Sequence, residues 1–124
     1  MKCLEQLIGA QLISIDNNKI IVKKDRKLYT IIIEDYEGDC CGYNDIETAL
    51  WYRKKSKRNP IITHIEKETT ECYEGQSCLL TFFGEDRKLA EINSYSSSGS
   101  GWAYGATVTL ECKKLHIEEV LSSW

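Results

Sequence analysis

The sequence Tyr95-Ser-Ser-Ser-Gly-Ser-Gly-Trp-Ala-Tyr-Gly-Ala-Thr-Val-Thr-Leu110 joins a Ser/Gly-rich loop to two aromatic residues and then to an alternating segment. From Ala106 onward apolar and polar residues alternate, which is typical of a strand with one buried face. The loop is expected to present aromatic rings at the end of a sheet, where they would form a contact surface. The stretch contains no catalytic motif. The residues predicted to point inward from the strand are Ala106, Val108, Leu110 and Cys112.

The N-terminal third of the chain is predicted to be an antiparallel meander. Residues 3–9 favour a short helical segment that ends at Gly9. Strands are predicted at 11–16, 19–24 and 28–34, and the isoleucine run in the third makes it the most buried. Asn17-Asn18 and Asp25-Arg26 separate these strands as tight turns, the first with residues that tolerate a positive φ.

The middle of the chain is predicted to hold a helix that begins at Asn44. Asn44 suits an N-cap, Glu47 stands three residues later as in a capping box, and apolar residues follow at helical spacing. The basic run 53–58 suits the C-terminal end of the helix dipole, and Pro60 follows the helix. The alternative is that residues 43–46 pair as a short strand.

The second half of the chain is predicted to be mostly strands, at 61–68, 79–83 and 88–94 and from Ala106 onward. The tail 115–122 is compatible with a short helix, because its apolar residues share one helical face. The sequence therefore predicts one α+β domain over residues 1–124. Its mostly antiparallel curled sheet or partial barrel of about seven strands carries one inserted helix and a short C-terminal helix.

Composition limits the classes of function. The 124 residues are 42% hydrophobic and 28% charged, which is the balance of a globular domain with its own core. A net charge of −3 disfavours direct nucleic-acid binding and is too small for a wholesale DNA mimic. The N-terminus lacks a signal-peptide pattern, and no apolar stretch is long enough to span a membrane, so a cytoplasmic protein without membrane contact is expected.

The six cysteines are expected to be reduced, because the chain has no export signal and is large enough to fold without disulfides. No Cys-x-x-Cys knuckle accompanies the adjacent pair Cys40-Cys41, so no metal and no other cofactor is expected. Catalytic motifs such as a nucleophile elbow, a P-loop or HExxH are also missing. His64 and His116 belong to no motif, and Glu66 and Glu68 on a strand edge are expected to be solvated. The sequence therefore predicts that the protein is not an enzyme.

Four short motifs carry a resemblance that covers roughly residues 7–112: Leu7-Ile8-Gly9, Asp39-Cys40-Cys41, the strand 60–68 and the turn Gly101-Trp-Ala-Tyr-Gly105. With them the chain resembles a family of small proteins encoded mainly by bacteriophages and prophages and described as a domain of unknown function. The resemblance implies a β-rich phage accessory protein in the cytoplasm of a bacterial host, and it implies no activity. Family members have an Asn-Gly-Tyr-Tyr-type turn, from which Trp102-Ala103 departs.

Two clusters are candidate binding sites. The first is predicted to dock a partner protein or to stack on a planar ligand, and the alternative is that its rings cap the core; it comprises Tyr95, Trp102 and Tyr104. The second could hold phosphate or an acidic protein surface, but we favour an ordinary solvated helix end; it comprises Trp51, Tyr52, Arg53 and Lys54.

The protein is expected to bind a host protein stoichiometrically and thereby to inhibit a host defence system. The most concrete version is an anti-CRISPR-type inhibitor. The alternative is a sequestering protein for a nucleotide second messenger. Its base would stack on Trp102 and Tyr104, and Arg53 or Lys54 would neutralise its phosphates. A structural or uncharacterised phage protein is a third interpretation.

Overall fold

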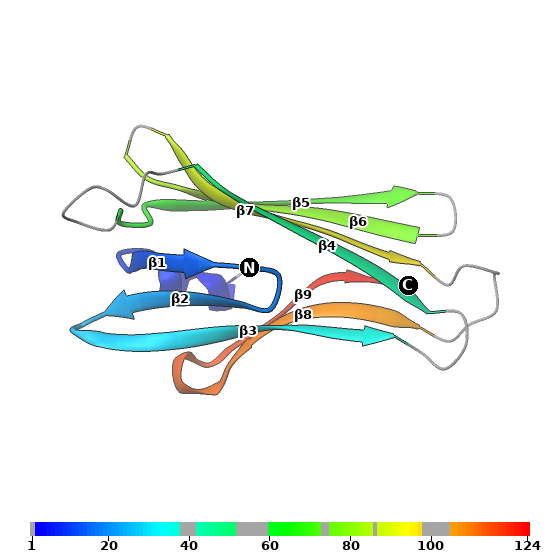
Figure 1. The fold of residues 1–124 in the computed structure, drawn as a ribbon, viewed down its shortest axis with the longest axis horizontal. Helices are drawn as coiled ribbons and strands as arrows, with labels where there is room; N and C mark the ends of the chain where they lie inside the picture. The colour runs from blue at the N-terminus through cyan, green and yellow to red at the C-terminus, as the bar shows by residue number, and fades with distance from the viewer. Residues whose placement is uncertain (1, 38–41, 52–59, 73–74, 86, 98–104) are drawn as a thin grey trace.

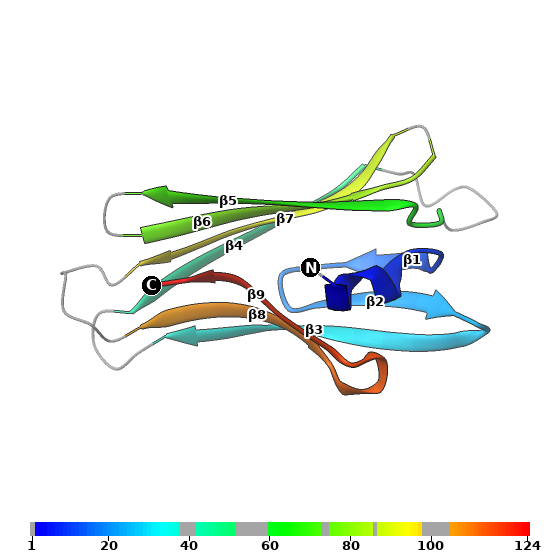
Figure 2. The ribbon, with the colours of Figure 1, turned by 180° about the vertical axis from the view of Figure 1, so that it is seen from behind.

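The chain folds into two antiparallel β-sheets that lie over each other as two layers (Figures 1 and 2). The computed structural model describes residues 2–37, 42–51, 60–72, 75–85, 87–97 and 105–124. In these residues the elements are the 3-10 helix η1 (Lys2–Leu7), β1 (Gln11–Ile15), β2 (Lys19–Lys24), β3 (Lys27–Glu37), β4 (Tyr43–Leu50), β5 (His64–Cys72), β6 (Gly75–Phe83), β7 (Lys88–Ser97), β8 (Ala106–Cys112), the 3-10 helix η2 (Lys113–Leu115) and β9 (Ile117–Ser123).

Sheet A has the strand order β1-β2-β3-β8-β9, and sheet B has the order β4-β7-β6-β5. All neighbouring strands are antiparallel. In sheet B, β5, β6 and β7 follow one another and β4 lies beside β7, which is a Greek-key order. The chain crosses from sheet A to sheet B after β3 and returns after β7. The ribbon β3/β8 of one sheet is therefore continued by the ribbon β4/β7 of the other.

The hydrophobic core lies between the sheets and includes buried residues from both. Strand β3 shows the one-sided burial: Ile31 and Ile33 are buried, whereas Ile32 between them is 44% exposed. The isoleucine run therefore has an inner and an outer face. The expectation that it makes this the most buried strand is wrong, because β7 and β8 hold more buried residues. At β8 the predicted alternation is confirmed, because the four residues predicted to point inward are all buried.

The predicted meander is confirmed as β1, β2 and β3, and so is the tight turn at Asp25-Arg26, but the turn at Asn17-Asn18 is built differently from expectation. Asp25 and Arg26 have φ values of 51° and 66°, as a two-residue turn of type I′ requires. Asn17 and Asn18 have no positive φ. Instead, the Asp16 carboxylate accepts hydrogen bonds from the backbone N–H groups of Asn18 (2.7 Å) and of Lys19 (3.0 Å).

The predicted helix beginning at Asn44 is wrong, because these residues form β4. The strand pairs with β7 over its whole length, from Tyr43 opposite Ser97 to Leu50 opposite Ala90. Asn44 is only 7% exposed and lies inside the sandwich, so it caps no helix. The alternative of a short strand at 43–46 was right in kind and too short. The basic run 53–58 lies outside the described residues.

The predicted C-terminal helix is also wrong, because β9 pairs with β8 across an irregularity between Val108 and Thr109. A turn at His116, with φ of 55°, leads into it. The prediction of an α+β domain with a curled sheet or partial barrel is therefore replaced by a nearly all-β domain of two open sheets. Among the described residues, no helix is long and apolar enough to cross a membrane.

Candidate binding face

The outward side of sheet B presents a regular grid of side chains from all four strands. Inward residues such as Cys78, Leu80 and Ile92 are buried, so the residues between them point outward. The strand register aligns the outward residues into four cross-strand rows, each with one residue from every strand. We call these positions the sheet B face: Tyr43, Asp45, Glu47 and Ala49 on β4; Ser97, Tyr95, Asn93 and Glu91 on β7; Gly75, Ser77, Leu79 and Thr81 on β6; Cys72, Thr70, Glu68 and Glu66 on β5.

Carboxylates are the only charged groups at these positions, whereas the next cross-strand row of the same register holds Lys88 on β7, Phe83 on β6 and His64 on β5 and borders the face at one end. The carboxylates are Asp45 and Glu47 on β4, Glu66 and Glu68 on β5, and Glu91 on β7. Outward neighbours on one strand lie about 6.7 Å apart, and β4 and β5 are separated by three strand spacings, about 14 Å. The face therefore carries a row of negative charge along each edge, with Glu91 between them.

A pair of tyrosines stands at the end of this face where β4 begins and β7 ends. The rings of Tyr43 and Tyr95 are 6.5 Å apart at an angle of 63°, an edge-to-face contact. Gly75 lies beneath the second ring, because a Cβ there would be 2.5 Å from the Tyr95 hydroxyl oxygen and 2.6 Å from Cζ. Tyr43 is 50% exposed, so the pair offers an aromatic surface to a partner.

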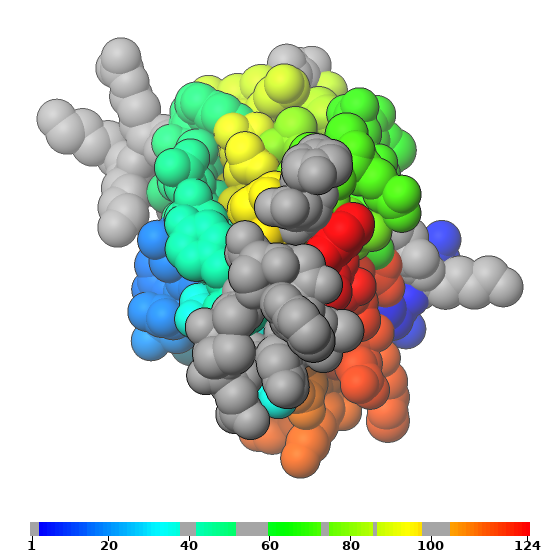
Figure 3. All heavy atoms as spheres, turned by 90° about the vertical axis from the view of Figure 1, so that its right-hand side faces the viewer, coloured from blue at the N-terminus to red at the C-terminus, as the bar shows by residue number. Residues whose placement is uncertain are grey.

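The structure describes only part of the two predicted clusters. Tyr95 is half-buried on the sheet B face, and Trp102 and Tyr104 lie outside the described residues. Figure 3 shows this end of the sandwich, with the first residues of β4 in blue-green, the last of β7 in yellow and the end of β9 in red. In the second cluster Trp51 is 46% exposed, and its backbone N–H donates to the Leu89 carbonyl.

Tyr52, Arg53 and Lys54, the rest of the second cluster, also lie outside the described residues. Trp51 follows the last residue of β4, whereas Tyr43 is the first. Eight residue steps in a strand span about 26 Å. The described members of the two clusters therefore lie at opposite ends of β4 and do not form one site.

Tyr43 is not among the predicted site residues, although the alternative strand at 43–46 included it. The two acidic rows were not predicted either. Their local signals, Asp45-x-Glu47 and Glu66-x-Glu68, have the period of a strand face, but only the register shows that both pairs share one side of a sheet.

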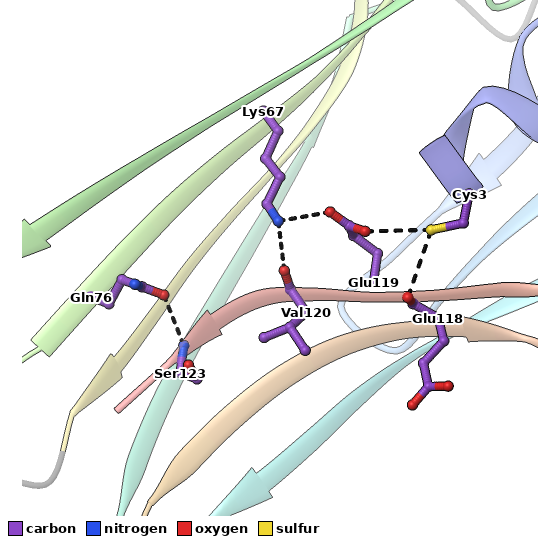
Figure 4. Close-up of polar contacts among 7 residues, drawn as sticks. All are labelled: Cys3, Lys67, Gln76, Glu118, Glu119, Val120 and Ser123. Atoms are coloured by element: carbon purple, nitrogen blue, oxygen red, sulfur yellow. Dashed lines mark hydrogen bonds and ion pairs between the residues drawn. The ribbon is translucent and has the colours of Figure 1, made fainter. Parts of the chain in front are cut away.

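A polar cluster lies on the inward side of sheet B, where its edge strand β5 faces β9, the edge strand of sheet A (Figure 4). We call it the β5/β9 cluster. The Lys67 ammonium donates to Glu119 Oε1 at 2.8 Å and to the Val120 carbonyl at 2.7 Å. Cys3 Sγ donates to Glu119 Oε2 at 3.4 Å, and the Ser123 N–H donates to Gln76 Oε1 at 3.1 Å. The side chains of Lys67 and Gln76 therefore form hydrogen bonds with backbone groups on the outer edge of β9. In this way the cluster protects a strand edge.

The electrostatics of this cluster follow from its partial burial. Burial by itself raises the pKa of Glu119, but the hydrogen bonds from Lys67 and Cys3 outweigh it, and the pKa is lowered. Burial also raises the pKa of the nearby Cys78 thiol, which suppresses the reactive thiolate. The cluster is therefore best suited to holding the sheets together.

The remaining predicted chemistry is sparse in the described residues. Cys3, Cys72, Cys78 and Cys112 are free thiols, and Cys40 and Cys41 lie outside the described part of the chain. No group of three metal-ligating side chains suited to a metal ion occurs among the described residues. His64 contacts Glu66 at 3.3 Å and packs against Phe83.

The resemblance to a phage-encoded family remains a prediction carried by its short motifs. Compared with models of protein families, with curated proteins and with solved structures, the chain matches none.

Proposed function

We propose that the protein is a binding protein that acts stoichiometrically, with the sheet B face as its contact surface. The observation that carries the proposal is the pair of exposed Tyr43 and half-buried Tyr95 at the end of a sheet face over which no described strand or helix lies (Figures 1 and 2). Tyrosines give large contact area at low entropic cost and are enriched at interface hot spots. A regular sheet holds such a surface rigidly, so little ordering entropy opposes binding.

The concrete version of this proposal is a phage or mobile-element protein that inhibits a host defence effector in the bacterial cytoplasm by occupying its surface. It is supported by the resemblance to a phage-encoded family. A stoichiometric inhibitor requires contact area and no reaction chemistry, which agrees with the polar groups of the β5/β9 cluster serving the fold.

Sequestration of a nucleotide second messenger is the weaker alternative. It needs Arg53 or Lys54 to reach phosphates of a base stacked on Trp102 and Tyr104 in one site. The flanking residues Trp51 and Ser97 lie near opposite ends of the ribbon β4/β7. The described cluster members, Tyr95 and Trp51, therefore do not contribute to one small-ligand site, which favours a protein partner.

The test is recovery of a complex of defined stoichiometry from bacterial host lysate, followed by native mass spectrometry. Tyr43→Ala combined with Tyr95→Ala should weaken the complex at least about tenfold, since hot-spot aromatics contribute about 2 kcal/mol or more. Tyr36→Ala is the matched control, because Tyr36 is 65% exposed on β3 of the other sheet. The proposal fails if no stoichiometric partner is recovered, or if the control weakens the complex equally.

A further inference from the structure

The net charge of −3 conceals a segregated charge distribution. The charged positions of the sheet B face are all carboxylates, and Lys88 and His64 border the face at one end. The basic side chains of the meander gather on β2 and at the β2–β3 turn in sheet A, and they are Lys19, Lys23, Lys24, Arg26 and Lys27. Sheet A also carries Glu34, Glu111 and Glu118 close together on β3, β8 and β9, so its charges are mixed, and the small net charge does not describe the sheet B face.

The carboxylates of the sheet B face outnumber the described cations beside them, which are His64, 3.3 Å from Glu66, and Lys88 in the bordering row. Glu66 and Glu91 lie on either side of Thr81 in one cross-strand row, and Glu47 and Glu68 belong to the neighbouring cross-strand row. These carboxylates are not directly opposite one another, so their repulsion costs the sheet little, and no position between them holds a cation. Between described residues, the only cationic groups in ion-pair contact are Lys67, which faces the other sheet, and His64, a weak base. The face therefore keeps a negative charge that a cationic partner can neutralise.

The tyrosine pair adds a second, independent preference. Asp45 stands beside Tyr95 in the register, and Tyr43 is the next outward residue on the same strand. An arginine guanidinium stacks on tyrosine rings and forms paired hydrogen bonds with a carboxylate. This end of the face therefore offers both contacts that an arginine side chain makes best.

From the charge complementarity and this aromatic end, we infer that the sheet B face docks a protein whose contact surface is rich in arginine and lysine. The inference deepens the proposed binding function and rests on it. The partner's cations bridge the two acidic rows, about 14 Å apart, and arginine packs against the tyrosine pair. Binding of this kind associates rapidly and weakens as salt screens the charges.

The inference can be tested with a defined basic probe, a fluorescein-labelled nona-arginine peptide, by fluorescence anisotropy. A Gly/Ser peptide of the same length is the uncharged control. Glu66→Gln with Glu68→Gln removes two charges from the sheet B face. Glu111→Gln with Glu118→Gln removes two charges from paired positions on the outer side of sheet A, so both variants have the same net charge. Their melting temperatures are measured to confirm that both fold.

The nona-arginine peptide should bind, the Gly/Ser peptide should not, and the sheet B variant should bind about tenfold more weakly. That loss corresponds to about 1.4 kcal/mol for two charge contacts. The sheet A variant should change affinity less than twofold. Equal losses in the two variants, or no binding by the unmodified protein, would overturn the inference. If a host complex forms through Tyr43 and Tyr95 but the basic peptide does not bind, the proposed function stands and the basic partner is wrong. If the peptide binds this face selectively and no host complex forms, the preference of the face for a basic surface stands and the proposed function is wrong.

Discussion

Lys67 on the edge strand of sheet B lies 2.8 Å from Glu119 on the edge strand of sheet A, and the pair joins the two sheets along one side of the sandwich. Their side chains are only 20% and 13% exposed. The ammonium also binds the Val120 carbonyl. One lysine therefore supplies both the charge for a shielded carboxylate and a donor for an edge backbone group.

Replacing Lys67 with methionine should lower the free energy of unfolding by about 2 kcal/mol. The estimate lies between the value of under about 1 kcal/mol for exposed ion pairs and the loss of about 3–5 kcal/mol when a fully buried pair is broken. Methionine keeps much of the aliphatic stem, so the change reports on the ammonium. Urea unfolding measures the effect, and Lys23→Met on the exposed side of β2 is the control. Equal losses in both variants would show that the ion pair contributes nothing specific.

Acid should weaken the fold through Glu119. Its pKa in the folded protein is below the ordinary value of 4.5, so the unfolded chain binds its proton more tightly. The contribution to stability is complete above about pH 4.5 and is lost as the pH falls through the lower, folded pKa.

Glu119→Gln should therefore be less sensitive to acid over this range, which urea unfolding at a series of pH values below about 6 would reveal. Glu34 has a raised pKa, because Glu111 shares a hydrogen bond with it and repels its charge. That group is present in both proteins and cancels in the comparison. Parallel pH profiles for the two proteins would contradict the assignment.

Asn44 joins both sheets at the corner where the ribbon passes between them. Its Nδ2 donates to Asp35 Oδ1 at 2.7 Å and to the carbonyls of Tyr36 and Thr107 at 2.8 and 3.2 Å. Its Oδ1 accepts from Ser96 Oγ at 2.5 Å. Asn44→Asp keeps the shape but sets a carboxylate against three acceptors, so we expect a loss of about 3 kcal/mol or more at neutral pH.

Asn93→Asp is the matched control for this change, because Asn93 is exposed on the outer side of β7. It should change the free energy of unfolding by under about 0.5 kcal/mol. Thermal or urea unfolding of both variants gives the comparison. A small effect at Asn44 would mean that the corner does not depend on its donated hydrogen bonds.

Much of the fold was predictable, because its strands alternate and alternation is a local signal. The meander and the inward set of β8 could be predicted on that basis. The helix at Asn44 was wrong because Asn44 and Glu47 do satisfy a local capping pattern. Pairing with β7, far away in the sequence, buries Asn44 and outweighs that preference. The tail failed similarly: apolar residues at Ile117 and Leu121 suit a helix face, yet β8 offers a strand partner.

The candidate site was less predictable for the same physical reason. Tyr95 could be predicted as a contact residue because a Ser/Gly-rich loop follows it in the sequence. Its neighbours on the sheet, however, are determined by the strand register. Tyr43 comes from β4, which is distant in sequence, and Gly75 comes from the far end of β6, the strand that precedes β7. A shift of one residue in any strand would exchange its inner and outer faces, so no local pattern could assemble the face.

The contact between Gly75 and Tyr95 gives a sharp test of this register. Alanine is normally better than glycine in a strand by about 0.5–1 kcal/mol, but a Cβ at residue 75 would lie 2.5 Å from the Tyr95 hydroxyl oxygen and 2.6 Å from Cζ of its ring. Gly75→Ala should therefore destabilise the protein by about 1 kcal/mol. In a Tyr95→Ala background the ring is gone, and the same change should be neutral or stabilising. Urea unfolding of the four proteins in this double-mutant cycle should give a coupling of about 1–2 kcal/mol. Additive effects would mean that the ring does not lie over Gly75, and the aromatic end of the sheet B face would have to be rebuilt without it.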